Sequence, residues 1–287
     1  MNFKLIAFAA AACALFISGC SKDNDGSDGP APLPRTSRIT QITTSIPSQS
    51  LSGNTKYTYD AQGRLTSVSE FSTSGSSVIE YSYGAKGSVT IATETTSARE
   101  GTLTYSDRVT LTEGRVNRID GVYKWLREDG SVYSSREYTY RYTYDAQGHL
   151  TAIGRSEWDP STPQSPWQWV NTLEWNGDLL VKYTDYDGHT MPTFIYTYEY
   201  SQATAEQPMV LPFTFHKQYD ELVRAGYFGK LPARLIARRT QTGLIGEQYV
   251  RVYTYSVTDG RISDFSTTIN YGTDKAYTVY NEVTYAK

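Results

Sequence analysis

A short segment that occurs twice constrains this chain more than any other feature. Residues 57–68 have the sequence Tyr-Thr-Tyr-Asp-Ala-Gln-Gly-Arg-Leu-Thr-Ser-Val, and residues 142–153 repeat it almost unchanged. Tyrosine and threonine alternate with the period of a strand, so the two tyrosines of each copy share one face. Asp-Ala-Gln-Gly favours a tight turn, because aspartate caps turns and glycine adopts a positive φ readily. Each copy therefore predicts a strand, a turn and the start of the next strand.

The same turn recurs along the chain as glycine, a polar residue, an apolar residue and a second apolar residue three positions later. Copies begin at Gly63, Gly114, Gly148 and Gly260, with looser copies at Gly87 and Gly177. The shorter intervals accommodate one strand pair with its turns, so hairpins follow one another in sequence order. The strands before these turns carry alternating tyrosine and few aliphatic residues, which argues against a dry sandwich core. We therefore predict an all-β fold, an antiparallel meander of successive hairpins that forms a curled sheet or a partly open barrel.

One segment breaks this pattern. Phe215, Tyr219, Leu222 and Val223 lie at i, i+4, i+7 and i+8, which is the spacing of an amphipathic helix. Gly226 is placed to end that helix. We predict one short helix near residues 214–226 that lies across an open end or face of the sheet and supplies core; a mobile lid is the alternative.

The amino terminus has the features of an export signal. Lys4 is followed by an apolar stretch, residues 5–17, that is too short to anchor the chain by spanning a bilayer. The stretch ends Ile-Ser-Gly-Cys at Cys20, which resembles the lipobox of bacterial lipoproteins and implies that Cys20 becomes the lipidated first residue. We predict a signal peptide at 1–20, a disordered acidic and proline-rich tether at 21–37, and a single β-rich repeat domain at 38–287.

Composition excludes several kinds of site. Cys13 would leave with the signal and Cys20 would carry lipid, so we expect neither a disulfide nor a cysteine nucleophile. The three histidines lie in different hairpins without metal-ligand spacing, and we expect no metal and no cofactor. The net charge of −3 with scattered Lys and Arg gives no indication of nucleic-acid binding. Asp185 and Asp187, beside His189, are the one carboxylate pair that could serve a glycosidase, but short Asp-x-Asp-Gly segments are commonly hairpin turns, and a turn is expected here.

Aromatic residues give the stronger indication of a binding site. Trp158, Trp167, Trp169 and Trp175 lie within one short stretch, and three prolines between the first two predict a loop. Flat rings beside polar residues suit stacking on a sugar or anchoring a protein partner. Cross-strand packing within the sheet is the structural alternative.

Two family resemblances bear on the whole chain. The Tyr-x-Tyr-Asp-x-x-Gly-Arg-Leu sequence of residues 57–65 resembles the YD repeats of large secreted bacterial shell proteins, although the copies here are few and irregular. Residues 20–287 are similar to tyrosine-rich Bacteroidetes lipoproteins that share a domain of unknown function. This similarity implies an outer-membrane lipoprotein, and the acidic segment after Cys20 resembles a signal for surface exposure. A periplasm-facing position is the alternative, and the resemblance brings no catalytic residue.

These observations predict a lipid-anchored protein of the cell envelope that binds a ligand without enzymatic activity. Carbohydrate is the first candidate ligand, through the tryptophan hairpin, and an envelope protein is the second candidate partner. A structural or assembly subunit of an envelope complex is the main alternative function. An envelope lipid carrier and a carboxylate glycosidase are lesser alternatives.

Overall fold

The structure is a computed structural model of the chain. It describes residues 37–73, 75–84, 88–97, 101–157, 168–186, 192–213 and 216–287. For 97, 155–157 and 168–170 it describes the backbone alone. Cys20 and the rest of the predicted signal and tether up to residue 36 lie outside the described residues. Ser37, which we assigned to the tether, is buried, and its hydroxyl donates to Glu206 Oε2 at 2.5 Å.

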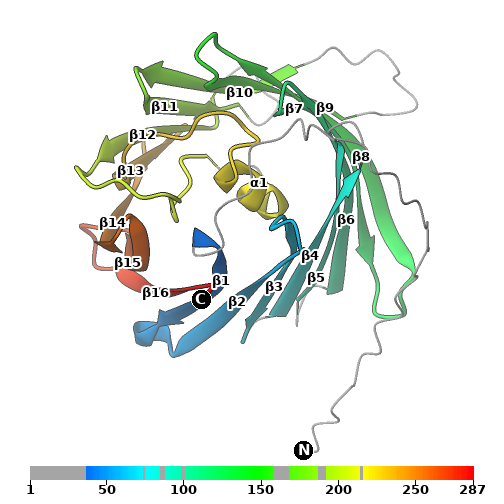
Figure 1. Cartoon of the computed structure of the whole chain (residues 1–287), viewed down its shortest axis with the longest axis horizontal. Coiled ribbons are helices and arrows are strands. Elements are labelled where there is room, and N and C mark those ends of the chain that lie inside the picture. Colours follow the sequence, from blue (N-terminus) through cyan, green and yellow to red (C-terminus); the bar gives the residue numbers. More distant parts are fainter. Residues whose placement is uncertain are drawn as a thin grey trace, which may run out of the picture.

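Sixteen antiparallel strands follow one another in chain order and close into a barrel, because β1 pairs with both β2 and β16 (Figure 1). This confirms the predicted all-β meander, and the barrel is closed rather than partly open. The strands are β1 Ile39–Ile46, β2 Leu51–Tyr59, β3 Leu65–Ser72, β4 Gly75–Gly84, β5 Ser88–Ser97, β6 Gly101–Thr112, β7 Arg115–Leu126, β8 Val132–Tyr144, β9 Leu150–Glu157, β10 Gln168–Asn176, β11 Leu179–Asp185, β12 Phe194–Tyr200, β13 Ile236–Gly243, β14 Gln248–Thr258, β15 Arg261–Ile269 and β16 Tyr277–Tyr285. Short helices are η2 Pro47–Gln49, η3 Lys217–Tyr219 and α1 Asp220–Arg224.

The repeated turn has the geometry that its sequence predicts. Asp60 Oδ1 accepts a hydrogen bond from the Arg64 amide at 2.8 Å, and Asp60 Oδ2 lies 2.8 Å from Arg64 Nε. Gly63 has a φ of +83°, and a side chain there would collide with the Arg38 guanidinium. In the second copy Asp145 accepts from the His149 amide at 2.8 Å. Aspartate therefore closes the turn, and glycine is required both by its conformation and by a neighbouring arginine.

In most hairpins an aromatic side chain near the end of the second strand forms a hydrogen bond with the start of the first strand. This contact lies at the end of the hairpin opposite the loop that connects the two strands. The Tyr59 hydroxyl donates to the Ile39 carbonyl at 2.8 Å, while the Arg38 guanidinium lies over the Tyr59 ring. The Tyr83 hydroxyl donates to the Leu65 carbonyl at 2.9 Å in the same way. We call this hydrogen bond the aromatic clasp. The other clasps join Tyr144 to Val116, Trp175 to Leu150, Tyr200 to Leu180, Tyr255 to Ile236, and Tyr285 to Ile262.

The connection between β12 and β13, residues 201–235, folds into the barrel as a plug. Its described residues include many buried apolar and aromatic side chains, namely Met209, Leu211, Phe213, Tyr219, Leu222, Val223, Tyr227, Phe228 and Leu235. Its main chain bonds to the turns around it, with Val116 N donating to Tyr227 O at 2.8 Å and Lys230 N donating to Gly148 O at 3.0 Å. Figure 1 shows α1 inside the ring of strands. The plug therefore fills the end of the barrel at which the repeated turns lie.

The predicted helix is present but short. The helical stretch runs from Lys217 to Arg224, within the predicted range, and Tyr219, Leu222 and Val223 are buried as predicted. Gly226 has a φ of +85°, and its amide bonds to the Val223 carbonyl at 3.0 Å, so it ends the helix. Phe215 lies outside the described residues.

Antiparallel order makes the connections alternate between the two ends of the barrel. Residues 60–64, 113–114, 145–149, 177–178 and 259–260 lie at the plugged end. Residues 47–50, 127–131, 244–247 and 270–276 lie at the opposite end, which we call the mouth. No helix in the part of the chain that the structure describes is long and apolar enough to cross a membrane.

We expect the substitution Tyr144→Phe to lower the free energy of unfolding by about 1–3 kcal/mol, because it leaves the Val116 carbonyl without its hydrogen bond. Urea denaturation measures the change. Tyr280→Phe is the matched control, since Tyr280 is 52% exposed on β16. Equal midpoints for the two variants would contradict a stabilising role for the clasp.

Candidate functional site

A cavity of about 560 Å³ opens at the mouth of the barrel. Strands β1 to β5 and Lys217 of the plug line it, and its walls carry many small hydroxyl side chains, among them Thr44, Thr55, Ser72 and Thr95. This volume lies within the range of small-molecule sites in proteins, about 300–1,000 Å³. We call this space the mouth cavity.

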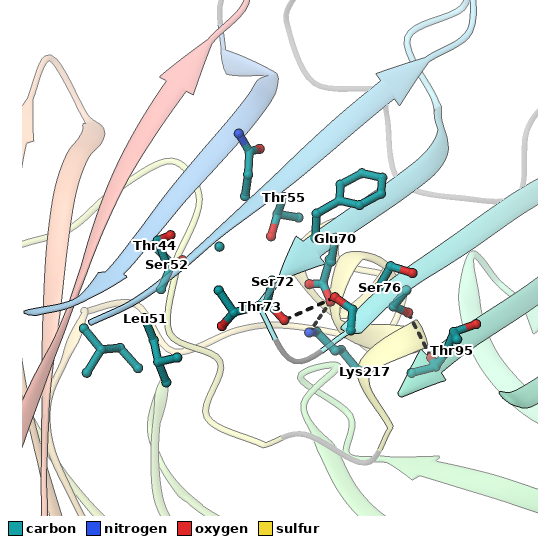
Figure 2. Close-up of a pocket in the computed structure, with 17 residues that line it drawn as sticks. Thr44, Leu51, Ser52, Thr55, Glu70, Ser72, Thr73, Ser76, Thr95 and Lys217 are labelled. Carbon is teal, nitrogen blue, oxygen red and sulfur yellow. Dashed lines mark hydrogen bonds and ion pairs between the residues drawn. The ribbon is translucent and has the colours of Figure 1, made fainter. Parts of the chain in front are cut away.

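An ion pair spans the mouth cavity from the wall to the plug. Figure 2 shows the Glu70 carboxylate on β3 and the Lys217 ammonium pointing toward one another. The Lys217 side chain is 63% exposed, so water screens the pair and its contribution to stability is small. Both groups are therefore free to exchange partners with a polar ligand at low energetic cost.

A second hollow, of about 280 Å³, adjoins the mouth cavity. The two lie side by side, because Thr95 of the mouth cavity pairs with Leu103 across β5 and β6, and Lys217 follows His216 in sequence. The second hollow is lined by Leu103, Tyr105, Tyr123, Trp125, Tyr138, Tyr140 and His216. We call it the aromatic pocket.

A buried carboxylate fixes the inner side of the aromatic pocket. Asp107 is 1% exposed and accepts hydrogen bonds from the hydroxyls of Tyr138 and Tyr219 and from the side-chain amide of Gln218. Burial raises the pKa of Asp107, against the opposing effect of these three donors. Gly121 lies directly opposite Asp107 on β7, where a Cβ would stand 2.2 Å from Asp107 Oδ1. The network therefore ties two plug residues to the wall of the barrel.

A second group of charges lies at the start of α1. Glu221 and Arg224 form a partly buried ion pair, and the Arg224 guanidinium also donates to the carbonyls of Pro208 and Met209. Burial raises the pKa of Asp220 to about 7, although Arg224 opposes the shift. Among the described residues, Asp220 Oδ1 has no hydrogen-bond partner. This carboxyl is therefore favoured in its neutral form within the fold.

Of the four tryptophans that the sequence grouped, the structure describes the side chain of Trp175. Trp175 lies near the plugged end, where its indole stacks on His149 with ring centroids 4.4 Å apart and donates to the Leu150 carbonyl at 2.8 Å. Trp169 belongs to β10 and pairs through its backbone with Gly154, and its side chain lies outside the described part. Trp158 and Trp167 also lie outside the described residues, so a site formed by them stays a prediction. For Trp175, both the ring face and the N–H group contact the protein itself, which favours packing.

The remaining predicted groups are distributed as follows. Asp185 ends β11, and its carbonyl accepts from the Thr193 amide, while Asp187 and His189 lie outside the described residues. Within the described residues, no cluster of three His, Cys, Asp or Glu side chains could hold a metal ion.

Sequence reasoning missed the aromatic pocket and Asp107. A signal was present in β6, where the inward positions Leu103, Tyr105, Asp107 and Val109 alternate with outward polar residues. An acid on the apolar face of a strand indicates a buried polar network. The contribution of His216 had no such signal, because the plug brings it to the pocket from a distant part of the chain.

The sequence of part of this chain matches a known protein family. The family model described as Teneurin YD-shell matches residues 35–159, which supports the YD-repeat resemblance in that part of the chain.

Two solved structures have a similar fold. A crystal structure of a porin-like protein from Bacteroides uniformis ATCC 8492 is similar over 88% of this chain and 99% of that chain, at 15% identity and a TM-score of 0.58. A porin-like protein from Bacteroides vulgatus ATCC 8482 matches 87% of this chain and 98% of that chain, at 13% identity and a TM-score of 0.51. A search of the curated proteins found no match. At these identities the two structures share the fold, and membership of the particular lipoprotein family stays a prediction.

We expect Gly121→Ala to destabilise the fold by about 1–3 kcal/mol, because the added methyl group overlaps Asp107 and Tyr138 in a packed interior. Urea denaturation measures this. Ser106→Ala, at the neighbouring exposed position on β6, is the control and should leave the midpoint unchanged. A wild-type midpoint for Gly121→Ala would show that the network tolerates displacement.

Stability should fall as pH rises from 5 to 8, in part through Asp220. A carboxyl whose folded pKa is near 7, above its usual value of 3.8, stabilises the fold when protonated, and this contribution is lost as pH rises through 7. Asp220→Asn removes the titration, so its urea midpoint should fall less between pH 5 and pH 8 than that of the wild type. Glu94→Gln, at an exposed position on β5, should behave as the wild type does. Parallel pH profiles for Asp220→Asn and wild type would refute this assignment.

Proposed function

We propose that this protein is a non-enzymatic binding module of the cell envelope, held on the outer membrane by lipid on Cys20, and that its ligand is a carbohydrate bound at the mouth. The observation that carries this proposal is the difference between the two ends of the barrel. The plug fills one end, whereas the other contains a cavity of about 560 Å³ with hydroxyl-bearing walls and an adjoining aromatic pocket.

The position of the amino terminus supports an orientation with the mouth away from the membrane. The chain enters β1 at Ile39, which lies at the plugged end beside Tyr59. A lipid on Cys20 would attach the chain to the membrane from the side of the plugged end, through the tether predicted at 21–37. The mouth would then be presented to a ligand outside the bilayer, which is the arrangement that a surface-exposed binding protein needs.

The two faces of the strands support a barrel that stands in water. Many inward positions below the mouth cavity are apolar or tyrosine, such as Ile79 and Tyr81 on β4, while exposed charged side chains such as Glu80, Glu94 and Arg108 lie on the outer face. Barrels that span outer membranes have the opposite arrangement, with an apolar band outside and a polar lumen. The lipid anchor, rather than the strands, would therefore provide the attachment to the membrane.

Carbohydrate fits the mouth better than the other ligand classes that the sequence suggested. Hydroxyl side chains and the Glu70–Lys217 pair offer many weak polar contacts, and the aromatic pocket offers ring faces for stacking. A lipid carrier would need a predominantly aliphatic cavity, whereas serine and threonine are frequent in this one.

A role as an assembly subunit is the second candidate, favoured by the rim of the mouth. Large apolar side chains are exposed on or beside the hairpin tips there, and such patches mark interaction surfaces. They are Leu51, Phe71, Val132, Tyr133, Leu244, Ile245 and Tyr271, with exposed fractions between 39% and 92%.

The test is a binding screen of the full chain, purified in detergent, against polysaccharides and mucin glycans. We expect saturable binding of at least one glycan, which calorimetry would quantify. Trp167→Ala, measured beside the wild type, tests whether the predicted tryptophan hairpin takes part. A screen without any binder, together with a stoichiometric partner protein that co-purifies from the envelope, would replace the carbohydrate proposal with the assembly role.

A further inference from the structure

We propose that the aromatic pocket is the subsite for one ring of a neutral oligosaccharide. The inference rests on the proposed carbohydrate function and adds the place, the number of rings and the charge of the sugar that is recognised.

The dimensions and the rings of the pocket suit a single pyranose. Its volume of about 280 Å³ lies just below the range for drug-sized ligands, so it has room for one ring of a longer chain. Tyr105 and Tyr123 form one wall, with ring centroids 6.0 Å apart and planes tilted by 50°, and both rings are partly exposed. Tilted, accessible aromatic faces match the apolar face of a sugar ring.

Hydroxyl groups are available at the edges of these rings. Among the described residues, no hydrogen-bond partner is found for the hydroxyls of Tyr105 and Tyr123. Tyr140 and His216 present a polar pair at the plug side, with 2.9 Å between the Tyr140 hydroxyl and His216 Nε2. A sugar ring needs this combination, because it is apolar on its faces and carries hydroxyls around its rim.

The lining also defines the charge of the ligand. None of the residues that line the pocket is Asp, Glu, Lys or Arg. The nearest carboxylate, Asp107, is buried beneath the pocket with both oxygens occupied by Tyr138, Tyr219 and Gln218. The cations nearest in register or sequence, Arg136 opposite Tyr123 and Lys217 beside His216, are not among the lining residues. A uronic acid or a sialic acid in the pocket would therefore lose hydration with only the His216 imidazole as a counter-ion, and His216 Nε2 already lies 2.9 Å from the Tyr140 hydroxyl.

The pocket is rigid on its inner side and continuous with more space on its outer side. Asp107 holds Tyr138 against the plug, so this wall needs no ordering when a ligand binds. The mouth cavity begins at Thr95 and Lys217, next to Leu103 and His216, and supplies hydroxyl contacts for the rings that follow. One ring would stack in the aromatic pocket while the chain continues along the mouth.

The experiment is calorimetric titration of the full chain in detergent with cellohexaose, maltohexaose and mannohexaose, and with oligogalacturonate as the charged probe. We expect at least one neutral probe to bind and oligogalacturonate to bind more weakly. Tyr105→Ala should weaken the neutral probe about tenfold by removing a stacking face. Tyr123→Phe, which keeps the ring, should weaken it about two- to tenfold through the lost hydroxyl. Tyr280→Ala, an exposed tyrosine on β16, should bind as the wild type does.

The outcomes separate this inference from the proposed function. Wild-type affinity in both Tyr105→Ala and Tyr123→Phe, or a preference for oligogalacturonate, would overturn the subsite while leaving a carbohydrate-binding protein. No binding of any carbohydrate by the wild type would overturn both. Tyr123→Phe removes a single oxygen, so its result stands even if Tyr105→Ala fails to fold, and urea midpoints establish which variants are folded.

Discussion

The aromatic clasp is the interaction on which the regular part of this barrel depends. Each hairpin has its own connection at the mouth, whereas at the other end its two strands are held together by the hydrogen bonds of their ladder. The clasp joins them there, through a hydrogen bond from an aromatic side chain to the first residues of the preceding strand. A residue in the turn before that strand then lies over the aromatic ring, as Arg64 does with its Cζ 4.7 Å from the centroid of the Tyr83 ring. The arginine of one turn thus contacts the tyrosine near the next turn, so the two repeat residues link neighbouring turns at the plugged end.

The two copies of the repeat differ in the residues that form the clasp, and the differences show which chemical properties the clasp requires. In the second copy of the turn His149 replaces arginine, and the aromatic residue that it stacks on is Trp175 rather than tyrosine. The indole N–H still reaches the Leu150 carbonyl at 2.8 Å, as a tyrosine hydroxyl would. What the position needs is a flat ring with one hydrogen-bond donor at its edge and a planar partner above it. Register shifts at Tyr59, Tyr144 and Trp175 help to aim these rings, since a bulge redirects a side chain.

The width of the barrel explains both its composition and its hollow end. Barrels of about sixteen strands are too wide for wall side chains to fill. This chain uses two means of filling the interior, namely large inward side chains, many of its 25 tyrosines among them, and the plug at residues 201–235. Within the plug, Tyr219 and Phe228 are fully buried, whereas Lys217 lines the mouth cavity and is exposed. The cavities are therefore the part of a wide barrel that the chain leaves unfilled.

The hairpins could be predicted from the sequence because their turns depend on residues close together in the chain. Closure of the barrel and the aromatic pocket could not be predicted, because they depend on contacts between distant residues. The turn at Asp60 and Gly63 follows from residues within a few positions of each other, and so does the end of the helix at Gly226. Closure depends on pairs such as Ile42 with Val283, which no local pattern reveals. The aromatic pocket likewise needs His216 beside Tyr140, two residues brought together only by the folding of the plug. Strand β10 carries Trp175 toward the plugged end, where it packs on His149, and this contact too depends on residues far apart in the sequence.

The residues that stabilise the fold and the residues available for binding lie at opposite ends of the barrel. At the plugged end, the aspartates, glycines, arginines and clasp aromatics are fixed by contacts with one another, so substitution there alters the fold. At the mouth, exposed side chains such as Ile245 and Tyr133 have little packing role, being 92% and 68% exposed. A rigid scaffold that presents variable connections at one end is the common arrangement of binding proteins. The same barrel could therefore accept different ligands through changes in its mouth alone, while the clasps and the plug keep its shape.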